Sequence, residues 1–157
     1  MALCESPLGG MGCGDAALGI LRMTTFDCKM CGDCCYGEGG IFLKEDEKGR
    51  ISRFLGINRS DFLTRFCEER NGRTYVTTGK DHFCVFYEKG QGCRVHPVKP
   101  ARCALWPYYP ANVNDRETWE MAKLACRGID REGSFEDFVK DSQTAIQNKD
   151  TALVEKS

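Results

Sequence analysis

The sequence lacks the features of an exported or membrane-bound chain. No basic residue precedes Arg22, and the first 22 residues hold a glycine-broken run instead of the apolar core of a signal peptide. No window approaches the roughly 18 consecutive apolar residues that a membrane span requires. We therefore expect a cytoplasmic protein with reduced thiols, whereas in an exported chain the same cysteines would predict disulfides.

An excess of charge and the common catalytic motifs are also missing. The formal net charge is −1, so electrostatics gives no reason to expect nucleic acid or a membrane surface as partner. A protein partner is compatible with this composition. The chain contains no glycine-rich phosphate loop, no nucleophile elbow and no zincin His-Glu-x-x-His motif. The sequence therefore assigns no enzymatic activity.

Cysteine, in contrast, is abundant. The 157 residues include 11 cysteines, and four of them, Cys28, Cys31, Cys34 and Cys35, lie within eight positions. Cys-x-x-Cys spacing lets a tight turn direct two thiolates at one ion, and overlapping pairs can hold an iron–sulfur cluster. Gly32 follows Cys31, and such a turn often needs the positive φ that glycine adopts freely. The pattern predicts a metal site.

Eight cysteines are candidate metal ligands. Cys4 and Cys13 lie in a glycine-rich leader and are given no role, and Cys67 falls on the apolar face of a predicted helix, where a thiol packs as a small hydrophobe. Eight thiols fit two four-thiolate sites, one cluster with a mononuclear site, or one site with additional reactive thiols. The candidates are Cys28, Cys31, Cys34, Cys35, Cys84, Cys93, Cys103 and Cys126.

Two further expectations concern individual ligands. Neighbouring side chains in extended backbone point to opposite faces, so Cys34 and Cys35 are expected to serve different sites, unless one of them is not a ligand. His96 follows Cys93 at x-x spacing and is held as a backup ligand for zinc or iron, although histidine before proline is commonly a structural residue.

The charged and the aromatic residues near the cysteines can each be interpreted in two ways. Cations that adjoin cysteines can offset the negative charge of a thiolate site, or they are ordinary surface charges; they are Lys29, Arg94, Arg102 and Arg127. Aromatic side chains after Cys103 are expected to cover the site and exclude water, with a base-stacking surface as the alternative; they are Trp106, Tyr108 and Tyr109.

Helices are predicted in four places. Weak apolar spacing indicates a helix within 44–55, and Asn58 or Ser60 can cap a second that includes Cys67. A short helical turn between Pro100 and Pro107 would place Cys103 on stiff backbone. Ser134 is expected to cap a final helix, with Asp137 as its capping-box partner. The apolar face of that helix would comprise Phe135, Phe138, Val139 and Ile146.

Strands are predicted between these helices. A short apolar run at 41–43 suits a strand, and alternation predicts a β-hairpin in which 73–78 pairs with 82–87. A second turn at 88–92 would place Cys84 and Cys93 on its two sides. Residues 118–124 are expected to form a last strand that delivers Cys126.

The cysteine pattern resembles a known family. The segments that carry the likeness are Cys28-x-x-Cys31-Gly-x-Cys34-Cys35, Cys84-Val-Phe, Cys93-Arg-Val-His-Pro-Val-Lys-Pro, Arg102-Cys103-x-x-Trp-Pro and Cys126-x-Gly. They resemble the CxxCxxCC zinc- or iron-chelating domain of the YkgJ-like cysteine-cluster proteins over about residues 26 to 130. A related cluster in flagellin lysine methylases is tied to an iron–sulfur cluster, so the resemblance favours iron, as a [4Fe–4S]-type cluster, without transferring an activity.

These observations predict one metal-binding domain. The expected organisation is a loose leader at 1–22, with Met23 as an alternative start, a single domain at 23–147 and a polar tail at 148–157. The expected fold is a small, irregular α+β domain with short hairpins and two or three helices around the metal. Its expected role is electron transfer, cluster handling or support of a partner. The alternatives are a structural zinc module for protein interaction and a cluster-dependent methyl- or redox-transfer enzyme.

Overall fold

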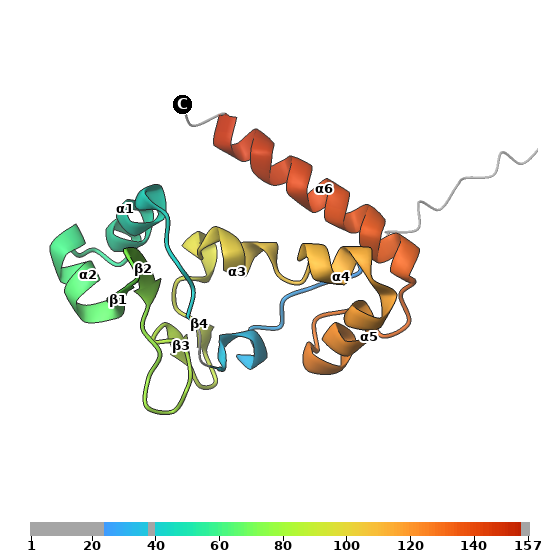
Figure 1. The fold of residues 1–157 in the computed structure, drawn as a ribbon, viewed down its shortest axis with the longest axis horizontal. Helices are drawn as coiled ribbons and strands as arrows, with labels where there is room; N and C mark the ends of the chain where they lie inside the picture. The colour runs from blue at the N-terminus through green and yellow to red at the C-terminus, as the bar shows by residue number, and fades with distance from the viewer. Residues whose placement is uncertain (1–23, 38–39, 155–157) are drawn as a thin grey trace, which may run out of the picture.

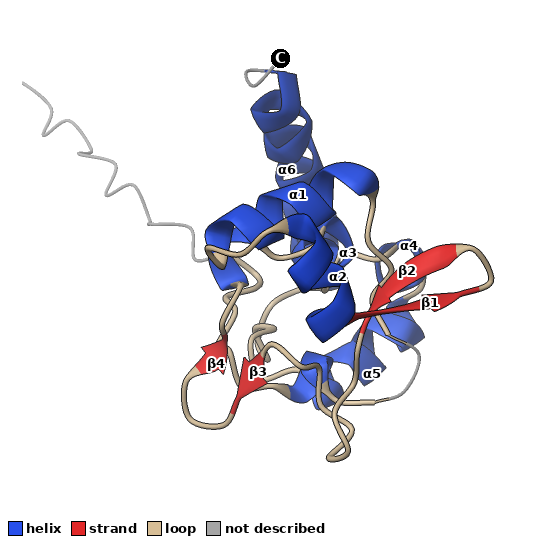
Figure 2. Ribbon diagram, turned by 90° about the vertical axis from the view of Figure 1, so that its left-hand side faces the viewer, coloured by secondary structure: helices blue, strands red, loops and turns tan. Residues whose placement is uncertain are grey.

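The computed structural model describes residues 24–37 and 40–154, with side chains described up to residue 147. The predicted leader, with Cys4, Cys13 and Met23, lies outside the described residues. The α+β class is confirmed: helices dominate, and the named strands form two separate antiparallel hairpins (Figure 2). Helices are more numerous than expected, because two short ones flank Pro107 and another replaces a predicted strand.

The first lobe, residues 40–98, is organised around one apolar core. Helices α1 (Glu45–Phe54) and α2 (Arg59–Phe66) pack beside the hairpin of β1 (Cys67–Arg70) and β2 (Arg73–Val76), at the left of Figure 1. The predicted cap of α2 is confirmed, because the Asn58 side chain accepts a hydrogen bond from Asp61 N at 2.8 Å. The buried core consists of Leu43, Ile51, Phe62, Val76, Phe86 and Val95.

The hairpin of the first lobe pairs different residues from those predicted. Strand β2 pairs with the charged strand β1 through a turn at Asn71 and Gly72, whose φ values are 51° and 72°. Two consecutive residues with positive φ form the tight turn that matches strand twist, and Asn-Gly is the preferred pair there. Of the predicted pairing between 73–78 and 82–87, the isolated bridge Thr78–Cys84 is present. Cys67 begins β1 and packs against the first core, as its predicted packing role requires.

The second lobe, residues 104–147, is helical. It contains α4 (Pro110–Asn114), α5 (Arg116–Ala125) and α6 (Phe135–Val154), at the right of Figure 1. One cluster of buried residues joins Tyr108, Trp119 and Phe138, and a smaller one joins Ala122, Cys126 and Ile129. Helix α6 continues to Val154, past residue 148, where the polar tail was expected to begin.

The predicted strand at 118–124 is wrong. Asp115 accepts hydrogen bonds from the backbone amides of Glu117 and Thr118, at 3.3 and 3.2 Å, and so begins helix α5. The Ser134 cap of α6 is confirmed, because Asp137 N donates to Ser134 Oγ at 3.1 Å. The carboxylate of Asp137, the expected capping-box partner, accepts a hydrogen bond from the Ser134 hydroxyl at 2.8 Å. Ile146, expected in the core, is 42% exposed.

The cysteine-bearing segments lie between the two lobes (Figure 1). They are the strap, residues 24–37, with its short 3-10 helix η1 (Asp33–Cys35), and the hairpin of β3 (Tyr87–Glu88) and β4 (Gly92–Cys93). The 3-10 helix η2 (His96–Val98) and helix α3 (Ala101–Leu105) follow the hairpin. Among the residues described, no helix combines the length and apolar character needed to cross a membrane.

Candidate metal centre

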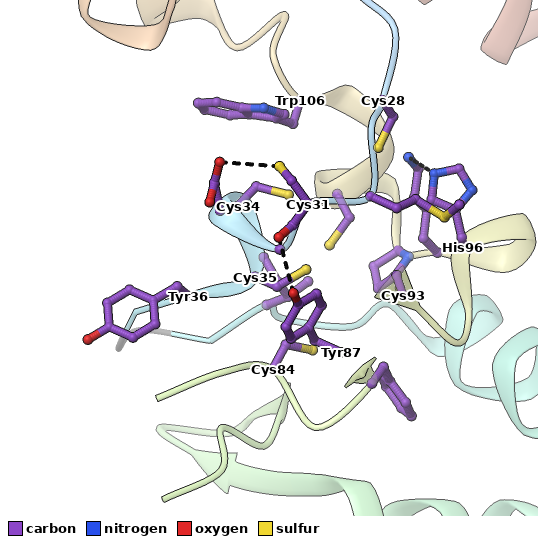
Figure 3. Close-up of a pocket in the computed structure, with 18 of the residues that line it drawn as sticks. Cys28, Cys31, Cys34, Cys35, Tyr36, Cys84, Tyr87, Cys93, His96 and Trp106 are labelled. Carbon is purple, nitrogen blue, oxygen red and sulfur yellow. Dashed lines mark hydrogen bonds between the residues drawn. The ribbon is translucent and has the colours of Figure 1, made fainter. Parts of the chain in front are cut away.

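The structure brings all eight candidate cysteines to one cavity. The cavity has a volume of about 460 Å³, and its wall includes each of the eight, from the strap, both sides of the β3–β4 hairpin, α3 and the end of α5 (Figure 3). Every cysteine in the described residues is a free thiol. Cys67 lies outside the cavity wall. The cavity wall therefore contains the eight cysteines chosen from the sequence as candidate ligands and leaves out Cys67. A place in the wall does not by itself make a cysteine a ligand.

The strap crosses from the second lobe to the first. At its beginning, Asp27 N donates to Gly128 O at 2.8 Å, beside a bridge between Phe26 and Ile129. At its end, Cys84 N donates to Cys35 O at 2.8 Å, beside a bridge between Tyr36 and Phe83. Hydrogen bonds at both ends of the strap therefore hold its four cysteines at the cavity, between the two lobes.

The turn after Cys31 requires glycine, as the sequence predicted. Gly32 has φ of 90°, and a Cβ at this position would lie 2.3 Å from Cζ of Tyr87. The Tyr87 hydroxyl donates to Cys31 O at 3.1 Å. The ring thus packs on the bare backbone of the turn, which fixes where Cys31 and the following helix η1 lie.

The expected divergence of Cys34 and Cys35 does not occur. The two residues are in the 3-10 helix η1 rather than in extended backbone, and both line the cavity. The Cys35 thiol donates a hydrogen bond to Cys34, which lowers the pKa of Cys34 to about 6 and raises the pKa of Cys35. Metal binding displaces protons from thiols, so a lowered pKa at Cys34 favours its use as a ligand.

The other cavity cysteines sit on defined backbone. Cys93 is opposite Tyr87 in the β3–β4 hairpin, and Cys84 precedes that hairpin, so the predicted turn between them is confirmed. Cys103 lies on α3, whose first amide, Ala101 N, donates to the buried Glu47 carboxylate at 2.6 Å. Burial raises the pKa of Cys103 to about 12 and also raises the pKa of Cys84 and Cys93.

Cys126 belongs both to the cavity and to the second lobe. It is 7% exposed, packs with Ala122 and Ile129, and accepts a hydrogen bond from Trp106 Nε1 at 3.5 Å. Trp106 and Tyr109 line the cavity as expected, whereas Tyr108 is turned into the second core beside Phe138. Two of the three predicted covering aromatics therefore lie at the cavity wall.

Two of the cations noted from the sequence, Lys29 and Arg102, have partners other than the thiols, although Lys29 also lines the cavity. Lys29 pairs with Asp27 at 2.5 Å on the exposed surface, and Arg102 lies 6.0 Å from the centroid of the Tyr109 ring. Arg127 pairs with Asp33 at 3.2 Å, and this carboxylate also accepts a hydrogen bond from Cys31 Sγ at 3.2 Å. Arg127 is thus the member of the predicted set that reaches the cysteine cluster through a contact.

Lys99 is the cation that sequence analysis missed. It lines the cavity with His96, and its Nζ lies 3.2 Å from His96 Nε2. Its charge acts to lower the pKa of Cys34, Cys93 and Cys103 against the effect of burial. Lys99 is not adjacent to any cysteine in the chain, although the Pro97-Val-Lys-Pro spacing signals a stiff segment that could have indicated it.

The thiols share a wall without forming a closed ligand cage. Within residues 24–37 and 40–147, no three cysteine, histidine or carboxylate side chains converge closely enough to hold an ion as they stand. The donor chemistry nevertheless fits a soft or borderline metal, because thiolates select zinc and iron–sulfur clusters. Binding would require the thiols to turn inward from backbone positions that already surround the cavity.

A comparison with protein-family models identifies the domain. Residues 27–131 match the CxxCxxCC family, described as "putative zinc- or iron-chelating domain". The chain belongs to this family. The match spans the strap, both hairpins and α5, and thus every cysteine of the cavity. No curated protein and no solved structure matches the chain. The family match therefore supports a role in binding zinc or iron.

Proposed function

We propose that this CxxCxxCC domain holds iron in a cysteine-ligated iron–sulfur cluster. The observation that carries the proposal is the cavity lined by eight free thiols from the strap, α3 and both lobes. A tetrahedral zinc site and a [4Fe–4S] cluster each use four thiolates, so eight thiols exceed what either centre needs and leave room for a second site or for additional thiols. The likeness of the cysteine pattern to the cluster of flagellin lysine methylases favours iron. The cavity cysteines would be the ligands, and the bound cluster would supply one-electron chemistry.

The surrounding residues support this use of the cavity. Trp106 and Tyr109 restrict water at one wall, and the Tyr87 ring fixes the turn of the strap. Lower water access and fixed donors are the features through which a protein tunes a bound metal. We propose electron transfer, cluster handling or support of a protein partner, in the cytoplasm, where thiols stay reduced.

A structural zinc module is the second candidate. It is favoured by the Cys31–Gly32 turn, whose positive φ and Cys-x-x-Cys spacing suit a zinc site, and by the position of the thiols between two lobes. In this case the metal would join the lobes and present them to another protein, and removing it would unfold the chain.

Metal and sulfide analysis after oxygen-free purification separates the two. The cluster proposal predicts brown protein with broad absorbance near about 400 nm and about four irons and four sulfides per chain. Colourless protein with stoichiometric zinc and no sulfide would reject the cluster and favour the structural module. Protein that binds neither metal after reduction would contradict both.

A further inference from the structure

Among the described residues, Lys99 is a cation at the cavity wall with no carboxylate in ion-pair contact. Among the ion pairs of the described residues, none involves Lys99, whereas Lys29, Lys48 and Lys123 each pair with an acidic side chain. The nearest polar atom given for its ammonium is Nε2 of His96, at 3.2 Å. A partly buried positive charge facing several thiols is costly unless a negative charge accompanies it.

The backbone around Lys99 is anchored to the first lobe. Arg50 Nη2 donates to Lys99 O at 3.3 Å, and the next-but-one amide, Ala101 N, donates to Glu47 Oε1. Glu47 is 2% exposed and also accepts a hydrogen bond from Lys44 N at 2.8 Å, so it joins the first turn of α1 to the first turn of α3. Pro100 fixes the backbone between these contacts. Lys99 is therefore held at the cavity by a rigid support.

His96 positions the ammonium. A lysine ammonium has only donors, so the Nε2 atom of His96 must be the acceptor in this contact. Nε2 is then engaged with Lys99 and is not directed at a metal, which differs from the backup-ligand role considered for His96 from the sequence. The histidine instead limits where the lysine side chain can point.

We propose that Lys99 is the charge partner of the metal–thiolate centre and that His96 holds its ammonium in place. The inference rests on the proposed function, because the partner charge is that of the thiolates once metal is bound. Four thiolates around a divalent ion leave a net charge of about −2, which buried surroundings must offset. Among the described residues, Lys29 and Lys99 are the lysines in the cavity wall, and Lys29 is paired with Asp27 whereas no ion pair engages Lys99.

The test compares Lys99→Met with Lys80→Met in the full chain. Both variants remove one lysine charge, but Lys80 is exposed and lies outside the cavity wall. Zinc affinity is measured by competition with a chromophoric chelator under reducing conditions. We expect Lys99→Met to weaken binding roughly 10- to 100-fold, as loss of a supporting residue around a metal site does, and Lys80→Met to leave it nearly unchanged. Lys99→Arg should restore most of the affinity.

The reduction potential of iron-loaded protein gives a second readout. Reduction adds negative charge, so loss of Lys99 should destabilise the reduced form and lower the midpoint potential. A tenfold effect corresponds to about 59 mV for one electron. A purely structural role for Lys99 predicts no such directional shift and no rescue by arginine. Melting curves of the metal-free variants establish that each one is folded.

His96→Gln separates positioning from ligation. The glutamine amide oxygen can accept a hydrogen bond from Lys99, so this variant should keep most of the metal affinity, whereas loss of a true ligand would abolish binding. Equal affinities for Lys99→Met and Lys80→Met in a protein that binds metal would overturn the role of Lys99 alone. Failure of the wild-type chain to bind metal would overturn the proposed function, and this inference with it.

Discussion

The two lobes differ in how they are held together. The first lobe has a continuous core in which the rings of Phe62, Phe66 and Phe86 lie within 6.3 Å of one another, centroid to centroid. The second lobe divides its buried residues into two smaller clusters, and a cavity thiol, Cys126, is a member of one. Burial of apolar surface is the main source of stability, so we expect the first lobe to depend less on the metal centre. Cavity thiols pack in both lobes, Cys84 and Cys93 against the first core and Cys126 in a small cluster of the second lobe. A bound metal would contribute the larger share of stability where the apolar core is smaller.

Metal removal should reveal the largest difference in stability between the two lobes. In hydrogen exchange of reduced, chelator-treated protein, we expect amides of α5 and the strap to lose protection by more than about tenfold, because metal binding and folding are coupled there. Amides of α1 and α2 should keep most of their protection. A uniform loss over both lobes, or none in either, would contradict the difference between them.

Truncation of a core ring in each lobe sharpens the comparison. Phe62 and Phe138 are both fully buried, and replacing either by alanine should cost about 3–5 kcal/mol of unfolding free energy. In metal-free protein, hydrogen exchange measured at increasing urea concentrations should show that Phe62→Ala destabilises the first lobe and that Phe138→Ala destabilises the second. If both variants shift one common transition equally, the lobes unfold as a single unit.

A smaller effect concerns alkaline pH and the first lobe. Burial raises the pKa of Cys67 from its usual value of 9.0 to about 11. Because the folded-state pKa lies above the unfolded one, the contribution of this thiol to stability is complete below about pH 9 and is lost as pH rises through the folded pKa.

The comparison of wild type with Cys67→Ala isolates this contribution. Urea midpoints of metal-free protein are measured at about pH 8 and about pH 10. Tyrosines and lysines also titrate over this range, but they do so in both proteins, so the comparison removes their effect. The midpoint should fall more steeply with pH in the wild type than in the variant. Parallel slopes would show that Cys67 is not buried as a neutral thiol.

Helix starts could be predicted from the sequence because a cap is a local signal. Asn58 and Ser134 cap α2 and α6 as expected, and Pro100 and Pro107 bound α3. The helix α5 was missed although Trp119, Ala122 and Cys126 recur at helical spacing. These three are buried, whereas Met121 and Leu124 are 70% and 78% exposed. Local pattern does not reveal which of two competing periods tertiary packing will select.

The candidate site was predicted in part for the same reason. Cysteine spacing identified all eight thiols that the fold brings to the cavity, but Cys34 and Cys35 were assigned to opposite faces because their 3-10 helix was not recognised. Lys99 was missed because only cations adjacent to cysteines were considered. Its position depends on contacts between α1 and the start of α3, which are 49 and 54 residues apart in the chain.

The metal content of two serine variants tests the central claim most directly. Cys84 packs against the core of the first lobe, and Cys126 belongs to the smaller buried cluster of the second lobe. If thiols from both lobes bind one centre, Cys84→Ser and Cys126→Ser should each lose most of the metal found after oxygen-free purification, while the control Cys67→Ser keeps it. Retention of full metal content in Cys126→Ser, with loss only in Cys84→Ser, would place the centre within one lobe and contradict the account.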